Sequence, residues 1–242
     1  MDRTVIIVTG ASRGIGAAIA GHLAEAGFTV ACLSRSGALP AGASDQPDRF
    51  LPHAVDVTDA EAMRAVIDRV AGQGRLAGIV NNAGQHREAA SATLSLAEWD
   101  GQWAMNATSV LIGCQAAYPH LAAAGGLIIN IGSFFDKIGV KRNLAYCASK
   151  AAVGAMTRVL AVEWAKHGIA VLDVAPGYIV TDLNRDQVLE GPLRAYLEKR
   201  IPGGKPGTAD DVGRLVASLY RMDLGFLTGE TIYIDGAQGV AH

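Results

Sequence analysis

The chain has 242 residues, of which 50% are apolar and 18% charged, with a formal net charge of −2. This near-neutral balance gives no electrostatic reason to expect nucleic acid or an anionic membrane as a partner. The three cysteines form no metal-ligand pattern, so we expect no metal. No run of about 18 apolar residues appears, so we expect no membrane span. The N-terminus lacks a signal-peptide pattern, so we expect a cytoplasmic protein.

Short, mostly β-branched runs alternate with helical stretches along the whole chain. We expect strands over 5–8, 29–33, 54–57, 79–80, 127–131, 170–174 and 231–234. We expect helices over 15–26, 60–71, 95–123, 148–167 and 209–220. Strands that alternate with helices predict βαβ units and a parallel sheet covered on both faces. The predicted fold is therefore α/β: a Rossmann-type doubly wound three-layer sandwich, in a single domain over 1–242.

Two segments interrupt this alternation. Residues 35–52 are too rich in Gly, Pro and Ala to predict a crossover helix. Residues 177–206 are longer and contain one possible helix, PLRAYLEKR. Long insertions after a strand are typical places for a lid or binding loop, so we predict a substrate-loop insertion at about 178–206. Surface decoration without a binding role is the alternative.

The stretch TGASRGIG joins the first expected strand to the first expected helix. Its glycines, Gly10, Gly14 and Gly16, allow a sharp turn and a close approach of the backbone to a ligand. Backbone N–H groups at the start of a helix bind phosphate, so the turn predicts a pyrophosphate site. The alternative is a purely structural turn, because three residues separate the first two glycines, unlike the common dinucleotide fingerprint.

Several further motifs follow in order along the chain. Asn82-Ala83-Gly84 closes an expected strand, Ser133 closes another, Tyr146 and Lys150 open a helix, and Pro176-Gly177 follows the next strand. Together with TGASRGIG, these motifs resemble the short-chain dehydrogenase/reductase family, of the single-domain type that includes 3-oxoacyl-acyl-carrier-protein reductases. The resemblance covers nearly the whole chain and implies a nicotinamide cofactor and hydride transfer.

The candidate catalytic residues are Tyr146, Lys150, Ser133 and Asn106. Tyr146 and Lys150 are four residues apart, on one helix face, and we expect the ammonium to lower the pKa of the phenol. The resemblance implies that Tyr146 exchanges the proton, Ser133 holds the substrate oxygen, Lys150 also binds the nicotinamide ribose and Asn106 maintains a proton relay. The alternatives are a surface ion–dipole pair, a strand-end cap at Ser133 and a hydrogen bond to a backbone kink at Asn106.

The end of the second expected strand bears on the choice of cofactor. NAD-preferring relatives carry an acidic residue where this chain has Ser34, and Arg35 follows it. With Arg13 in the glycine turn, two guanidiniums and no carboxylate favour a 2′-phosphate, so we predict NADP(H), with NAD(H) as the alternative. Solvated surface arginines are the competing interpretation.

The resemblance implies further cofactor contacts, each of which is also an ordinary strand-end or loop residue. They are Ser12, Ile15, Asp56, Val57, Asn82, Ala83, Gly84, Pro176, Gly177, Ile179 and Thr181.

The sequence offers weaker candidates for the residues that contact the substrate. Phe134, Phe135 and Tyr178 suggest an aromatic wall, and core packing is the alternative for each. His86 follows the Asn-Asn-Ala-Gly stretch and is a candidate for the mouth of the site, although a lone histidine there is usually incidental. Asp173 is an unusual acidic residue in a strand where relatives commonly carry an asparagine, and we expect it at an interface or paired with a base.

These observations predict an oxidoreductase that transfers a hydride between NADP(H) and a ketone or secondary alcohol. An NAD-dependent alcohol dehydrogenase and a non-catalytic nucleotide-binding regulator are the alternatives. The partner is a small carbonyl or alcohol substrate. The helical segment 148–164 is apolar on more than one face, which predicts a homo-oligomer, dimer or tetramer, unless deeper burial within one chain explains it.

Overall fold

A seven-stranded sheet forms the centre of the molecule. The computed structural model describes residues 3–41, 43–182, 184–190 and 192–241. All neighbouring strands are parallel, in the order β3-β2-β1-β4-β5-β6-β9. The strands are β1 (Thr4–Thr9), β2 (Thr29–Ser34), β3 (Phe50–Ala54), β4 (Arg75–Asn81), β5 (Gly126–Ile131), β6 (Ile169–Pro176) and β9 (Thr231–Ile234).

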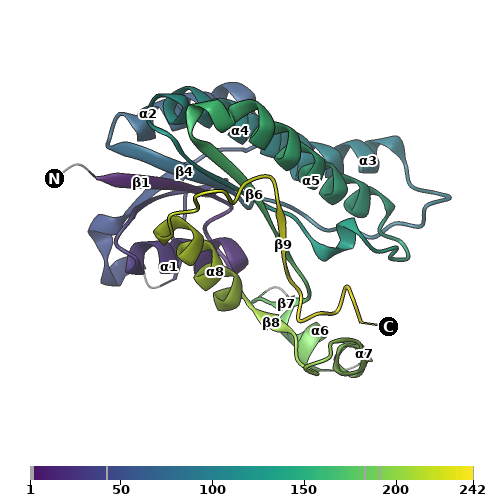
Figure 1. Ribbon diagram of the computed structural model, residues 1–242. Helices are drawn as coiled ribbons and strands as arrows, with labels where there is room; N and C mark the ends of the chain where they lie inside the picture. The colour runs from purple at the N-terminus through teal and green to yellow at the C-terminus, as the bar shows by residue number, and fades with distance from the viewer. Residues whose placement is uncertain (1–2, 42, 183, 191, 242) are drawn as a thin grey trace.

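Helices cover both faces of this sheet, which confirms the predicted doubly wound, three-layer α/β fold (Figure 1). One face carries α1 (Gly14–Glu25) and α8 (Ala209–Arg221); the other carries α2 (Ala60–Ala71), α4 (Ser109–Ala124) and α5 (Leu144–Trp164). Among the described residues, no helix is long and apolar enough to cross a membrane.

Alternate residues of the central strand β1 supply the two cores. Val5 and Ile7 pack with residues of α2, α4 and α5, whereas Ile6 and Val8 pack with residues of α1 and α8. All four side chains are fully buried, and each such burial stabilises the fold by about 1.5–3 kcal/mol. A strand that is apolar on both sides therefore belongs between two helical layers.

The order in which successive strands are placed in the sheet reverses between β1 and β4. From β1 the chain proceeds to β2 and β3 on one side, and then returns to β4 and continues to β5, β6 and β9 on the other. In open parallel sheets, ligands bind at the carboxyl ends of the strands at such a switch point. The fold thus predicts a site beyond the ends of β1 and β4.

The expected strand over 54–57 is wrong, because the strand is β3, Phe50–Ala54. Its register pairs Phe50 with Val30 and Ala54 with Ser34. As the edge strand, β3 tolerates Pro52. In the described part of the preceding segment, the helical structure consists of two short 3₁₀ turns, Ala43–Asp45 and Pro47–Arg49, which agrees with the absence of a predicted crossover helix.

The helix expected over 95–123 is divided. It consists of α3 (Leu96–Trp103), a π-helical turn over Ala104–Thr108 and α4. The Ser109 N–H donates to the Ala104 carbonyl, five residues back, so the turn holds one extra residue. This turn contains Asn106.

The predicted insertion forms a separate small unit beside the carboxyl edge of the sheet. It contains the paired short strands β7 (Ile179–Val180) and β8 (Gly207–Thr208), and the helices α6 (Arg185–Leu189) and α7 (Pro192–Arg200) (Figure 1). Val188, Leu197 and Ile201 make its own apolar cluster. Two insertion residues, Leu183 and Gly191, lie outside the described residues.

Candidate active site

The glycine turn after β1 is shaped by close backbone contacts. Gly10 and Gly14 have φ angles of +67° and +57°, which L side chains rarely adopt. A Cβ on Gly16 would lie 2.2 Å from the Gly10 carbonyl oxygen. The first turn of α1 has no side-chain cap at Arg13 and no acidic residue, which leaves its N–H groups and positive dipole end available to an anion. These features fit the pyrophosphate of a dinucleotide.

Thr9 and Asn82 join the glycine turn to the end of β4. The Thr9 hydroxyl oxygen accepts from the Asn82 and Ala83 N–H groups, each at 3.0 Å. The Asn82 amide in turn donates to the Thr9 carbonyl oxygen at 2.9 Å. These bonds hold the Asn82–Gly84 stretch against the turn, and Thr9 is a positioning residue that the sequence analysis missed.

A cavity of about 700 Å³ opens over this edge of the sheet. Of the predicted cofactor contacts, it is lined by Gly10, Ser12, Arg13, Gly14, Ile15, Gly16, Ser34, Arg35, Asp56, Val57, Asn82, Ala83, Gly84 and Thr181. It is also lined by five residues that were not predicted: Ser36, Ala38, Val55, Gln85 and Met105. Four of these directly follow or precede a predicted contact or Asn106, so adjacency was the available signal.

A smaller cavity of about 230 Å³ brings the predicted catalytic groups together. Ser133 follows β5, and Tyr146 and Lys150 lie one turn apart on α5. All three line this cavity, as do Pro176 and Gly177. Ile15, Asn82, Gly84 and Gln85 line both cavities, so the two are neighbouring parts of one site.

The protonation of Tyr146 differs from the expectation drawn from the sequence. Burial raises the pKa of this phenol above its ordinary value, while a hydrogen bond from Ser133 acts in the lowering direction. The Lys150 ammonium lies 5.9 Å from the ring centre and donates to the Ile131 carbonyl oxygen at 2.6 Å, and it is not among the groups that shift the pKa of the phenol. Tyr146 is therefore protonated at neutral pH.

Lys150 is itself buried, with 5% of its surface exposed. Burial lowers its pKa to about 8, and the opposite charge of Asp173 acts against that change. Asp173 is thus close enough to a base to interact with it, in agreement with the second of the two expectations for this residue.

Comparisons with known proteins agree with this geometry. A family model described as enoyl-(acyl carrier protein) reductase matches residues 10–238. The D-threitol dehydrogenase of Mycolicibacterium smegmatis is 36% identical, over 98% of this chain and 93% of that protein. The 3-oxoacyl-(acyl-carrier-protein) reductase of Haemophilus influenzae is 33% identical, over 98% of each. A gluconate 5-dehydrogenase structure from Burkholderia cenocepacia, in complex with NADP and tartrate, has a TM-score of 0.91 and 31% identity, over 100% of this chain and 97% of that one.

The chain belongs to the short-chain dehydrogenase/reductase family. The prediction made from its motifs is thereby confirmed, and the protein is a nicotinamide-dependent oxidoreductase that acts on alcohol and carbonyl groups.

In this dehydrogenase/reductase, Asn106 makes two hydrogen bonds to the loop that follows β4. Its amide donates to the Gln85 carbonyl oxygen at 2.9 Å, and its side-chain oxygen accepts from the Gln85 N–H at 2.8 Å. It is fully buried in the π-helical turn. These bonds go to the loop after β4 and not to the backbone of the π-helical turn, so the relay stays a prediction.

The aromatic residues proposed as a substrate wall pack against one another, and one of them, Phe135, also contacts Tyr146. The Phe135 ring meets the Tyr146 ring edge-on at 5.8 Å, and Phe134 meets Tyr178 at 5.6 Å. Phe134 and Phe135 are 2% and 7% exposed, and neither lines the smaller cavity. These contacts favour the packing alternative for the two phenylalanines, and Phe135 packs directly against the Tyr146 ring.

His86 lines the enzyme's smaller cavity, close to the mouth of the site for which the sequence made it a candidate. Its ring lies 4.8 Å from the Tyr146 ring and its Nε2 hydrogen-bonds Asn143 Oδ1. Asn143 precedes α5 and is 57 positions away in sequence, so no local pattern marked this pair.

Two other predicted contacts follow β6. Thr181 lies against the glycine turn, 3.6 Å from where a Cβ on Gly14 would be. Ile179 is buried in the apolar core shared with α1 and α8. Among the described residues of the enzyme, no group of three His, Cys, Asp or Glu side chains is arranged to hold a metal ion.

Proposed function

We propose that the protein transfers a hydride between NADP(H) and a ketone or secondary alcohol, with Tyr146 as the general acid and base. The observation that carries this proposal is the convergence of Ser133, Tyr146 and Lys150 on a small cavity that adjoins the glycine cradle. A regulator that only bound nucleotide would not need these three side chains together.

When bound, the cofactor supplies or accepts the hydride, and the chain supplies position and proton transfer. In reduction, the Tyr146 hydroxyl protonates the developing alkoxide; in oxidation, its phenolate removes the alcohol proton. The Ser133 hydroxyl donates a hydrogen bond to the substrate oxygen as negative charge builds on it. The Lys150 ammonium stabilises the Tyr146 phenolate and binds the nicotinamide ribose, while Asn106 keeps the Gln85 loop in place and maintains the proton relay.

The preference for NADP(H) rests on the end of β2. Arg13, Ser34 and Arg35 line the larger cavity, and no acidic side chain stands at the end of that strand. Guanidinium groups suit a phosphate because their donors form a planar fork. NAD(H) stays the alternative because Asp56 also lines this cavity, close enough for Arg35 to contribute to lowering its pKa.

We further propose a single cytoplasmic domain that assembles into a homo-oligomer through α5, with residues 178–206 as a substrate lid. Two valines of α5, Val159 and Val162, are 55% and 81% exposed although the opposite face of the helix is buried in the core. An apolar outer face supports contact with a second copy.

A spectrophotometric panel tests the proposal. NADPH and NADH consumption is followed with small ketones, keto derivatives of polyols and sugar acids, and 3-oxoacyl thioesters. We expect turnover with at least one class, faster with NADPH than with NADH. Faster turnover with NADH contradicts the cofactor preference. NADPH binding without turnover on any class favours the non-catalytic regulator.

A further inference from the structure

A row of polar side chains, three of them buried, crosses the sheet on the face that α5 covers. In Cα register from β4 to β9, the row consists of Asn81, Asn130, Asp173 and Thr231. Two residues earlier on the first three strands, the same face is apolar, at Ile79, Ile128 and Val171. The change from apolar to polar therefore occurs at one level of the sheet, next to the catalytic edge.

The two asparagines of this row have good partners. The Asn81 amide donates to Asn130 Oδ1 at 2.9 Å, and the Asn130 amide donates to the Thr157 hydroxyl at 2.9 Å. Asp173 differs. It is fully buried, its Oδ2 accepts from the Thr231 hydroxyl at 3.2 Å, and its Oδ1 has no hydrogen-bond partner among the described residues. The Gly132 N–H also acts to lower the pKa of this carboxyl. A buried carboxyl with so few donors either stays protonated or is stabilised in its charged form by a nearby positive charge.

The carboxylate of Asp173 is packed between the turn that precedes Ser133 and the inner face of α5. A Cβ on Gly132 would lie 2.4 Å from Asp173 Oδ1, and a Cβ on Gly154 would lie 3.7 Å from Asp173 Oδ2. Gly132 follows Ile131, whose carbonyl accepts from the Lys150 ammonium. Gly154 lies one helical turn after Lys150, on the same face of α5.

The electrostatics of the two groups are reciprocal. Lys150 lowers the pKa of Asp173 against the effect of burial, which raises it to about 6. Asp173 raises the pKa of Lys150 against burial, which lowers it to about 8. Between these two values, the carboxylate and the ammonium are both charged.

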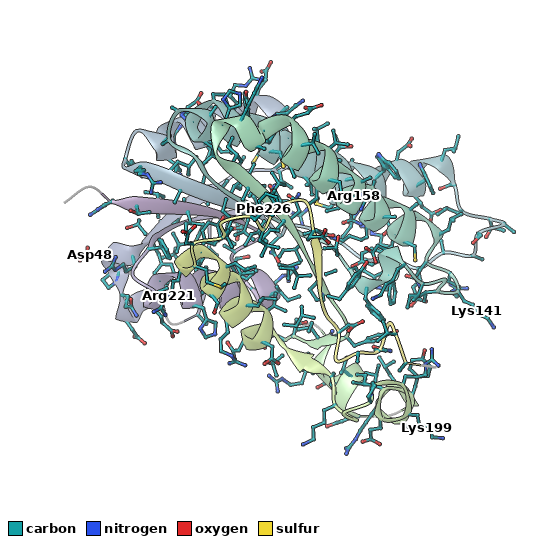
Figure 2. The ribbon with its side chains drawn as sticks, viewed as in Figure 1. Asp48, Lys141, Arg158, Lys199, Arg221 and Phe226 are labelled. Atoms are coloured by element: carbon teal, nitrogen blue, oxygen red, sulfur yellow. The ribbon has the colours of Figure 1, made fainter. Side chains whose placement is uncertain are left out.

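Other charged and titratable groups surround this pair. Asp136, after β5, raises the pKa of Asp173. Arg158 comes from α5, at the side of the β6–β9 edge, and its Nη1 lies 3.6 Å from the Cβ position of Gly154 (Figure 2). Tyr233, on β9, bonds Asp136 and has its own pKa raised by burial, by Asp136 and by Asp173. None of these is a buried cation, so Lys150 is the group that compensates Asp173.

We propose that Asp173 is a positioning residue of the active site, whose buried carboxylate keeps the Lys150 ammonium charged and held against the Ile131 carbonyl. The inference rests on the proposed function in one respect, that a charged Lys150 is what stabilises the Tyr146 phenolate. Asp173 acts through Lys150 and lines neither cavity of the site.

Asp173→Asn removes the charge and keeps the shape. Loss of an opposite charge beside Lys150 lowers its pKa by about one unit or more. The alkaline limb of the kcat–pH profile, where Lys150 loses its proton, moves down by about one pH unit. Thr157→Val is the matched control: it removes a buried hydrogen bond of the same row without changing a charge, and its profile stays that of the wild type.

A second measurement needs neither cofactor nor turnover. The free energy of unfolding in urea is measured from pH 5 to 9.5 for the wild type, Asp173→Asn, Lys150→Met and the double variant. Because the folded pKa of Lys150 is depressed, the unfolded chain binds more protons above that pKa, so stability rises with pH there. We expect this rise to begin near pH 8 in the wild type, at least about one unit lower in Asp173→Asn, and to be absent with Lys150→Met.

The outcomes separate this inference from the proposed function. If no substrate is turned over but the effects of Asp173→Asn and Lys150→Met on the free energy of unfolding are not additive in the double variant, the proposed function fails and the Asp173–Lys150 pairing stands. If turnover is present but both the kcat–pH limb and the stability curve of Asp173→Asn match the wild type, the inference is overturned. Should Asp173→Asn not fold, Lys150→Met supplies the test: loss of the ammonium raises the pKa of Asp173, so the fall in stability that accompanies ionisation of this buried carboxyl extends to a higher pH than in the wild type. An unchanged curve there also overturns the inference.

Discussion

The two cavities of the active site are built in different ways. The larger one is shaped by backbone: positive-φ glycines, an uncapped helix start and the paired ends of β1 and β4. The smaller one is shaped by side chains, with Ser133, Tyr146 and Lys150 backed by a buried Asp173. The glycine cradle thus depends on close packing of the β1 turn against the end of β4, whereas the proposed proton transfer depends on side chains brought together from the end of β5, from α5 and from β6. The predictions below test this division.

The largest expected effect outside the catalytic residues is on the glycine cradle. In Gly16→Ala, the new Cβ would lie 2.2 Å from the Gly10 carbonyl oxygen, so the turn must shift. We expect NADPH affinity to fall about 100-fold, or about 3 kcal/mol, measured by quenching of protein fluorescence.

Gly21→Ala is the matched control on the same helix, because a Cβ there meets nothing within 4 Å. It keeps NADPH affinity unchanged and gains up to about 1 kcal/mol in helix stability. Equal NADPH binding by the two variants would show that the cradle does not need its glycines.

A smaller effect is expected where a phosphate would meet Arg35. Arg35→Ala removes one charge-assisted interaction at the end of β2, which lowers NADPH affinity about tenfold and leaves NADH affinity unchanged. The control is Arg64→Ala, an exposed arginine on α2, which changes neither. Parallel losses for both nucleotides would remove the argument for NADP(H).

The smallest effect is expected far from both cavities. Ser95 caps α3 and forms a reciprocal capping box with Glu98. Ser95→Ala costs about 1 kcal/mol in the free energy of unfolding, measured in urea, because a first-turn N–H loses its acceptor. NADPH affinity and kcat stay at wild-type values. A large change in kcat would mean that the start of α3 transmits strain to the π-helical turn that holds Asn106.

The two regions also differ in how well the sequence predicts them. The helix over 60–71 has the predicted bounds, because Asp59 provides a clear cap, and PLRAYLEKR begins at a proline, which suits a first helical turn. The glycine turn and most of the residues that line the larger cavity were likewise predicted, from local motifs and the family resemblance they carry. Local patterns suffice where the interactions themselves are local.

Features that depend on contacts between distant segments were missed or left open. The edge strand β3 was placed too late because its sequence, FLPHA, carries a proline and little alternation. The π-helical turn depends on one backbone hydrogen bond that spans five residues instead of four, and no residue type in the sequence predicts such a bond. The base near Asp173 could not be named, because its identity requires the register of β5 with β6 and the packing of α5 on both.

The central claim is that nucleotide binding and proton transfer are separable functions of adjoining cavities. The most direct test measures NADPH affinity and kcat on the same preparation of Tyr146→Phe, with the best substrate of the panel. The account predicts wild-type NADPH affinity and a kcat reduced by at least about 100-fold. Near-wild-type turnover would contradict the role of Tyr146, and loss of NADPH binding would contradict the separation of the two cavities.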